Sequence, residues 1–185
     1  MSKQILDNFL DNFLDNIDVQ NKWSQNSYIN WLTGEKKPDG TPDESFMTHC
    51  SAFVASVCTQ LNVPILRPPE HNTEGLANAQ HDWLISDGSK YGWYRIMSGE
   101  DAQNEANNCK LVLVAYRNHL NDKGGHIAIL RSANTDTDNE LQVCQAGLVN
   151  SIRRPLSLCF IGDHKDKCKY FGINYVDYYR MEPPK

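Results

Sequence analysis

The spacing of apolar residues near the N-terminus predicts an amphipathic helix. Apolar residues recur in pairs every four positions, at 5, 6, 9, 10, 13, 14 and 17. This spacing places them along one helix face, although the intervening Asp and Asn residues have weak helix propensity. We expect this helix to pack on the domain; a helix that binds a partner or mediates dimerisation is the alternative. The aromatic-rich stretch from Trp23 to Leu32 predicts a second helix.

The most informative helix begins near Cys50. The run from His49 to Cys58 is amphipathic, and Thr48 can cap its start. Asn62-Val63-Pro64 stops it. Cys50 is therefore expected in the first turn. The core face of this helix is predicted to hold Phe53, Val54, Val57 and Leu61.

Two shorter helical patterns follow. Thr73 can cap a helix that extends to Leu84. The region from Asp87 to Tyr94 has the composition of a turn. Ser98 and Asp101 resemble a capping box for a short helix over 99–106.

The second half of the chain has the patterns of strands. A turn is predicted at 119–123 and a polar hairpin loop at 134–139. Strands are predicted at 110–116, 125–131 and 141–146, with further β-like runs around Phe160 and over 170–179. Helices followed by an antiparallel meander indicate an α+β fold.

The length of 185 residues is typical of one domain with its own core. We divide it into an N-terminal helical segment and loop at 1–44, which belong to the same domain, and a main part at 45–185. The loop is the polar stretch from Gly34 to Glu44.

Charge and hydropathy exclude several function classes. The net charge is −5 and no cluster of Lys and Arg resembles a phosphate-binding surface, so nucleic acid is not an expected partner. No stretch approaches the roughly 20 apolar residues that span a bilayer, so membrane insertion is not expected. The first residues lack the apolar region of a signal peptide, which predicts synthesis in the cytoplasm.

The six cysteines include no Cys-x-x-Cys pair and have mostly apolar neighbours. This favours reduced thiols, with Cys58, Cys109 and Cys144 in the core. A disulfide between Cys159 and Cys168 remains open. Cys159, His164 and Cys168 lack an evident fourth zinc ligand, so no metal is expected.

Three residues form a candidate nucleophile constellation. A helix N-terminus favours the thiolate of Cys50. His126 on a strand can take the thiol proton, and Gln145 on the next strand can orient the imidazole. His126, Ala128 and Leu130 share one strand face. If the Cys50 helix packs on that face, His126 reaches the thiol. His119 is the alternative base.

These motifs resemble those of the papain-like NlpC and CHAP peptidoglycan hydrolases. Cys-Ser-Ala-Phe-Val at 50–54 is similar to the superfamily's Cys-Ser-Gly-Phe-Val, and Gly-His-Ile-Ala-Ile at 125–129 to its Gly-His-Val-Gly-Ile. Gln145 matches its third position, where His, Asn or Gln occur. The resemblance covers roughly residues 45–150. It implies a papain-like fold, with N-terminal helices packed on an antiparallel sheet, and amide cleavage through a thioester without cofactor or metal.

The chain also departs from that superfamily. His49 stands where Asp is common before the Cys, Ala52 replaces a Gly, and Cys109-Lys110 replaces a Gly-Asp. Tyr28 does not match the spacing of an upstream Tyr that shapes the oxyanion site. We expect His49, Trp83 and Trp93 as substrate-contacting residues; the alternatives are core packing for each tryptophan and a surface position in the first helical turn for His49. These differences indicate a divergent branch.

The resemblance predicts a cysteine amidase or endopeptidase that acts on peptidoglycan stem peptides. Without a leader, such an enzyme would reach the periplasm or cell wall of a target cell as a delivered toxin or a lysis enzyme. A delivered toxin would imply an immunity protein that covers the Cys50 site. The alternatives are a thioester-based transferase or deamidase acting on protein or lipid, and a binding module with a degenerate site. Lipid-acyltransferase relatives place His before Cys, the reverse of the order here.

Overall fold

The fold is α+β, with helices and one open antiparallel sheet. The computed structural model describes residues 9–23, 29–30, 33, 35, 49–72, 75–120, 124–133 and 139–179. Six strands form the sheet in the order β1-β6-β2-β3-β4-β5. Their bounds are β1 Tyr94–Ile96, β2 Leu111–Tyr116, β3 His126–Leu130, β4 Gln142–Gln145, β5 Ser151–Pro155 and β6 Lys169–Ile173.

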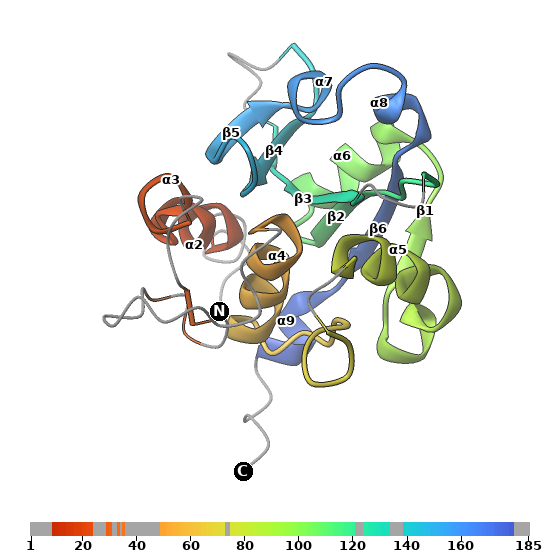
Figure 1. The fold of residues 1–185 in the computed structure, drawn as a ribbon. Helices are drawn as coiled ribbons and strands as arrows, with labels where there is room; N and C mark the ends of the chain where they lie inside the picture. The colour runs from red at the N-terminus through yellow and green to blue at the C-terminus, as the bar shows by residue number, and fades with distance from the viewer. Residues whose placement is uncertain are drawn as a thin grey trace.

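Helices cover both faces of this sheet. α4 and α5 lie in front of the sheet in Figure 1, and α6 lies behind it. The helices are α2 Phe9–Asn16, α3 Val19–Lys22, α4 His49–Gln60, α5 Leu76–Ser86, α6 Gly99–Asn107, α7 Leu156–Cys159, α8 His164–Lys167 and α9 Tyr175–Tyr179, with a 3-10 turn at Gly88–Tyr91.

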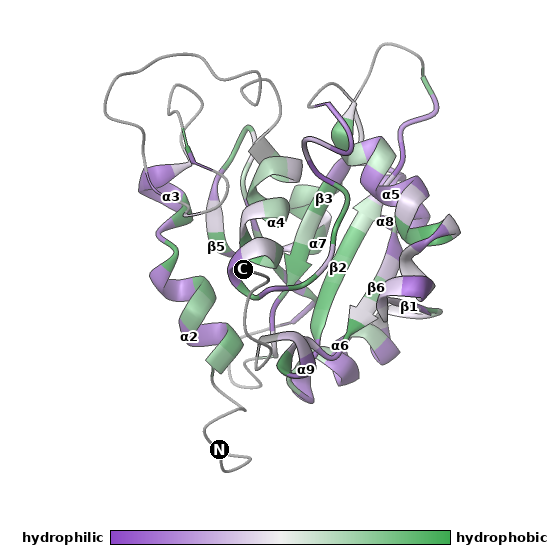
Figure 2. Ribbon diagram, turned by 90° about the horizontal axis from the view of Figure 1, so that it is seen from below, coloured by the Kyte–Doolittle hydropathy of each residue, from purple (hydrophilic) through white to green (hydrophobic). Residues whose placement is uncertain are grey.

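Two apolar layers result, one on each side of the sheet. The first joins α2, α4, α5 and α9 to alternate positions of the central strands, such as Leu113 and Ile127. The second joins α6 and α7 to the opposite positions, such as Val114 and Ala128. Every residue of β2 is buried because both of its faces are covered. Figure 2 shows β2 and β3 as the most continuously apolar strands.

The strongest sequence patterns are confirmed. α2 buries Leu10 and Leu14. α4 spans the predicted helix and buries its predicted core face. Ser98 caps α6, accepting a hydrogen bond from the Asp101 N–H at 3.0 Å. The strands β2, β3 and β4 lie within their predicted ranges, and they form the expected antiparallel meander.

Other predictions are wrong. Trp23 follows the short helix α3 and Ile29 forms a β-bridge, so the described residues of the aromatic stretch do not continue as one helix. Phe160 ends α7 instead of lying in a strand. The turn predicted up to Tyr94 leads into β1, β5 was not predicted, and the last β-like run divides into β6 and α9. Edge strands of three to five residues carry too little periodicity to be recognised.

Some predictions lie outside the described residues. They include the caps at Thr48 and Thr73, Tyr28 and the loop at 34–44. Gly75, in the left-handed conformation, stands at the N-cap of α5. Among the described residues, none of the helices has the length and hydropathy needed to cross a membrane.

All six cysteines are free, so Cys159 and Cys168 do not form a disulfide. Cys58 and Cys144 are buried as expected. Cys109 is only partly buried and has a φ of 59°, because it lies in the tight connection between α6 and β2 and not within a strand.

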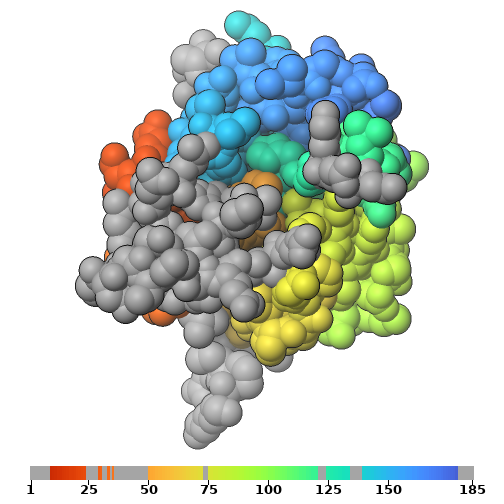
Figure 3. Space-filling view, in the orientation of Figure 1, coloured from red at the N-terminus to blue at the C-terminus, as the bar shows by residue number. Residues whose placement is uncertain are grey.

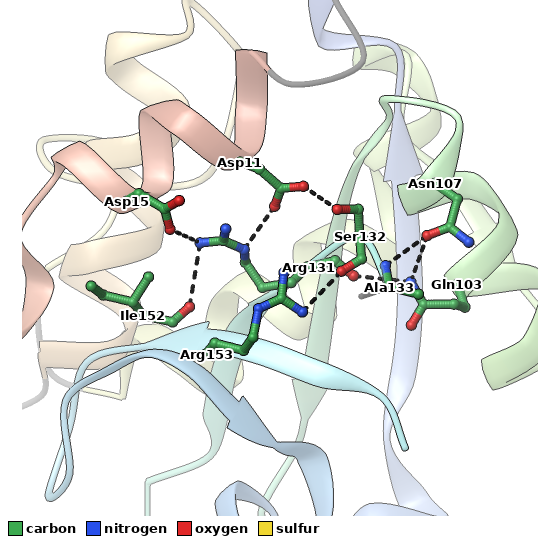
Figure 4. Close-up of polar contacts among 9 residues, drawn as sticks. All are labelled: Asp11, Asp15, Gln103, Asn107, Arg131, Ser132, Ala133, Ile152 and Arg153. Carbon is green, nitrogen blue, oxygen red and sulfur yellow. Dashed lines mark hydrogen bonds and ion pairs between the residues drawn. The ribbon is translucent and has the colours of Figure 1, made fainter. Parts of the chain in front are cut away.

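A buried arginine anchors the N-terminal helix (Figure 4). Arg131 directly follows β3, and its side chain is 3% exposed. Its Nε lies 2.7 Å from Asp11 Oδ1 and its Nη1 lies 2.8 Å from Asp15 Oδ1, both on α2. Ser132 Oγ also donates to Asp11, and Arg153 Nη1 donates to the Ser132 carbonyl at 3.0 Å. The N-terminal helix thus supplies both an apolar face, through Leu10 and Leu14, and two charge partners, Asp11 and Asp15.

We predict that Arg131→Leu destabilises the protein by about 2 to 3 kcal/mol. This is below the cost of breaking a fully buried ion pair, because the two carboxylates stay partly in contact with water. Urea unfolding followed by fluorescence measures the change. Lys90→Ala, which removes an exposed ion pair with Asp87, should have little effect. An Arg131→Leu protein as stable as the wild type would show that this anchor does not hold α2.

Candidate active site

The thiol of Cys50 lies at the start of α4, above the first residues of β3. Cys50 is the second residue of the helix and is 5% exposed. The first four N–H groups of a helix have no partner within it, and they place partial positive charge beside the thiol. The backbone N–H groups of Ile127 and Ser51 both hydrogen-bond the sulfur. The site therefore has several donors directed at one sulfur atom.

His126 and Gln145 form a direct hydrogen bond. His126 Nε2 lies 2.7 Å from Gln145 Oε1. The amide Nε2 of Gln145 donates to the Val149 carbonyl at 2.8 Å. A carbonyl can only accept, so this contact fixes the orientation of the amide and leaves Oε1 to accept from His126 Nε2–H. The other imidazole nitrogen, Nδ1, is then the one available to the thiol.

Strand register explains how Gln145 reaches the imidazole. Ile129 pairs with Cys144 and Leu130 with Val143. The same register, continued, places Gln145 diagonally from His126 on one face of the sheet, a distance that long side chains span. Gly147 falls opposite His126, and a Cβ there would lie 3.8 Å from His126 Cε1. The prediction that a hairpin brings Gln145 beside His126 is confirmed.

The Cys50 helix does not pack on the strand face that holds Ala128 and Leu130, the condition under which His126 was expected to reach the thiol. Cys50 and Phe53 pack with Ile127 and Ile129, whereas Ala128 and Leu130 belong to the layer on the other side. The His126 ring contacts Phe160 of that second layer, with ring centroids 4.8 Å apart. His126 still reaches the thiol because it is the first residue of β3. At the start of a strand a side chain is not confined to one face of the sheet.

Cys50 and His126 each shift the pKa of the other toward its charged form. Burial alone raises the pKa of Cys50, but the hydrogen bond and charge of His126, with the two backbone N–H groups, lower it below the ordinary value. Burial lowers the pKa of His126, but its interactions with Cys50 and the Gln145 hydrogen bond raise it above the ordinary value. Each partner stabilises the charged form of the other.

Burial dominates the pKa of four other thiols, Cys58, Cys144, Cys159 and Cys168. Burial raises the pKa of Cys144 to about 12, that of Cys159 to about 11 and that of Cys168 to about 12. Burial likewise raises the pKa of Cys58, which lies on the same helix as Cys50. The contrast between Cys50 and Cys58 shows that burial on α4 does not by itself produce a reactive thiol.

A glycine and an asparagine shape the backbone next to His126 and Gln145. A Cβ on Gly125 would lie 2.4 Å from the Tyr116 carbonyl oxygen, so only glycine fits before His126. The Asn150 side chain accepts from the Gly147 N–H at 2.9 Å and donates to the Trp23 carbonyl at 2.6 Å. The loop that orients Gln145 is therefore tied to the N-terminal segment. The packing constraint at Gly125 was not predicted from the sequence, and the roles of Val149, Asn150 and Phe160 had no recognisable sequence signal.

Of the three residues predicted to contact substrate, Trp93 lies in the core. Trp93 is 2% exposed and its indole N–H donates to the Pro64 carbonyl at 2.7 Å, so it is a core residue. Trp83 is partly buried against the first apolar layer and packs on Tyr91 with ring centroids 5.2 Å apart. His49 begins α4, but its side chain lies outside the described part. His119, the alternative base, contacts Arg117 Nη1 at 3.2 Å.

No group of three or more metal-ligating side chains occurs among the residues that the structure describes. Cys168 was considered as a zinc ligand, but its thiol donates a hydrogen bond to the His164 carbonyl at 3.1 Å, and the His164 ring stacks on Tyr116.

In Figure 3 the orange surface of α4 and the teal surface near β3 meet in a hollow beside yellow and blue segments. No family model and no curated protein sequence matches the chain.

We predict that iodoacetamide labels Cys50 before the other cysteines at about pH 6, where an ordinary thiol is mostly protonated. The lowered pKa of Cys50 keeps its thiolate present as the pH falls below the ordinary thiol range, and the rate declines only when Cys50 becomes protonated. Peptide mapping by mass spectrometry identifies the labelled residue.

The matched control for this labelling is His126→Ala. This substitution removes the side chain that offsets the rise in the Cys50 pKa caused by burial. Alkylation of Cys50 should therefore require a higher pH. Faster labelling of Cys58 or Cys168 than of Cys50 in the wild type would contradict the assignment.

Proposed function

We propose that this protein has a papain-like fold and acts as a cysteine amidase on the peptide stems of bacterial peptidoglycan. The observation that carries the proposal is the contact between Cys50 at a helix N-terminus and His126, whose far nitrogen is held by Gln145. The order of these residues and their neighbouring motifs, Cys-Ser-Ala-Phe-Val and Gly-His-Ile-Ala-Ile, support the NlpC and CHAP resemblance.

The first half of the reaction forms a thioester. The Cys50 thiolate attacks the carbonyl carbon of an amide, and the carbonyl oxygen becomes negatively charged. The Cys50 backbone N–H, which has no partner within α4, can donate to this oxyanion. The imidazolium of His126 then gives its proton to the leaving nitrogen as the C–N bond breaks. The products of this step are a free amine and an acyl thioester on Cys50.

The second half releases the acyl group. His126, now neutral, takes a proton from water while the water oxygen attacks the thioester carbonyl. The C–S bond breaks and releases a carboxylic acid, which loses its remaining proton to water to become the carboxylate, and the thiolate and imidazolium are restored. Gln145 keeps Nε2 occupied throughout, so the proton exchanges at Nδ1 on the side of the sulfur. These steps require neither a metal nor an organic cofactor.

Chemistry and charge support a peptide substrate. A thiolate suits an amide carbonyl, whereas glycan hydrolysis uses a pair of carboxylates. The net charge of −5 does not favour a polyanionic partner such as nucleic acid. The family resemblance favours the bond between D-glutamate and diaminopimelate. For a toxin delivered to another cell, the proposal includes an immunity protein that covers Cys50.

We expect digestion of purified sacculi to release new amines without new reducing sugar ends. Mass spectrometry of the soluble fragments identifies the bond that is cut. The Cys50→Ala protein, which lacks the attacking sulfur, is the control for contaminating hydrolases. Reducing ends without amines would reject the amidase. Release of neither product, with Cys50 still selectively reactive, would favour a transferase or deamidase that uses the same thioester.

Substitutions should separate the roles of the three side chains. Cys50→Ala and His126→Ala should each reduce amide hydrolysis by at least about a thousandfold, because nucleophile and base act as one unit. Gln145→Ala should keep part of the activity, since the imidazole retains its contact with the thiol. Circular dichroism checks that each variant is folded. Full activity of His126→Ala would transfer the role of base to another group, such as His119.

A further inference from the structure

Helix α5 contacts both elements that carry the reactive pair. It packs against α4, which holds Cys50, and against β2 and β3, which lead to His126. Two of its polar side chains, Asn78 and Gln80, make the specific contacts. Residues two apart on a helix do not face the same direction, so these side chains can reach two different elements.

Gln80 ties α5 to the first turn of α4. Its side chain is fully buried, and its Nε2 donates to the Ser51 carbonyl at 3.2 Å and to the Leu66 carbonyl at 3.0 Å. Ser51 directly follows the nucleophile, and its own N–H hydrogen-bonds the sulfur. A buried amide that bonds two carbonyls fixes the position of the peptide it contacts, because leaving those groups unpaired is costly.

Asn78 ties the same helix to the start of β3. Its Oδ1 accepts from the Asn118 N–H at 2.9 Å, and its Nδ2 donates to the Asn118 carbonyl at 3.3 Å. The Oδ1 atom also lies against Gly125, where a Cβ would approach it to 2.4 Å. Gly125 directly precedes His126. Asn78 therefore fixes both chain segments that flank the β2–β3 connection.

We propose that Asn78 and Gln80 are positioning residues that together set the distance and orientation between the Cys50 thiol and the His126 imidazole. The proposal rests on the reactive pair of the proposed function, but not on any particular substrate. Neither residue is expected to touch the substrate. Each acts through the backbone beside one member of the pair: Gln80 through Ser51, and Asn78 through Gly125.

The test is the pH dependence of Cys50 alkylation in Gln80→Met, Asn78→Ala and the wild type. Methionine keeps the length of the Gln80 side chain and removes both donated hydrogen bonds. We expect each variant to be alkylated about tenfold more slowly than the wild type at about pH 6, with the difference disappearing above the ordinary thiol pKa. Tenfold is the change in thiolate population expected from a shift of about one pKa unit.

Leu84→Ala is the matched structural control. Leu84 is buried on the same helix and belongs to the first apolar layer. Its truncation should lower the melting temperature and leave the pH profile of alkylation as in the wild type. Iodoacetamide is the probe throughout, and circular dichroism at each pH verifies folding.

The outcomes separate the two proposals. A wild-type profile like that of an ordinary thiol would overturn the reactive pair itself, and with it the proposed function. A low-pH wild-type profile that persists in both Asn78→Ala and Gln80→Met would overturn the positioning role. Because Asn78 is only partly buried, its variant keeps the test decisive if Gln80→Met does not fold.

Discussion

The contact between the Cys50 sulfur and the His126 imidazole is the interaction on which the rest of the site depends. Cys50 is buried and His126 is partly buried, and their loss of water contact acts against the charge of each. A charged pair in such a place persists only when hydrogen bonds replace the lost water. The donors to the sulfur come from the first turn of α4 and from β3, and the acceptor for the imidazole comes from Gln145. The architecture of the sheet end follows from these requirements.

Elements distant in the chain also contact the segments that hold Cys50 and Gln145. Asn150 connects the loop that orients Gln145 to the carbonyl of Trp23, and Trp23 packs edge-on against Phe53 of α4 with ring centroids 5.4 Å apart. Arg131 joins the end of β3 to α2. The described N-terminal residues therefore contact the elements that hold Cys50 and Gln145.

The sequence was most informative where periodicity was strong and long. The twelve residues of α4 and the continuous apolar run of β2 were recognisable, and so was the pairing of His126 with Gln145, because strand alternation constrains which side chains can meet. The face on which α4 packs was not recognisable, since both faces of β3 are apolar: Ile127 and Ile129 on one, Ala128 and Leu130 on the other. Tertiary contacts alone decide between them. The burial of Trp93 could not be recognised from the sequence either, because an indole suits a binding groove and a core equally well.

The central claim is that His126 and Cys50 form a charged pair in the folded protein. The most direct measurement is an NMR titration of the His126 imidazole nitrogens in the wild type and in Cys50→Ala. The account predicts that the imidazolium of the wild type persists above the ordinary histidine pKa, because the thiolate raises the pKa of His126. Removing the sulfur should lower that pKa, since burial then acts without the opposing charge. An identical His126 titration in the two proteins would contradict the account.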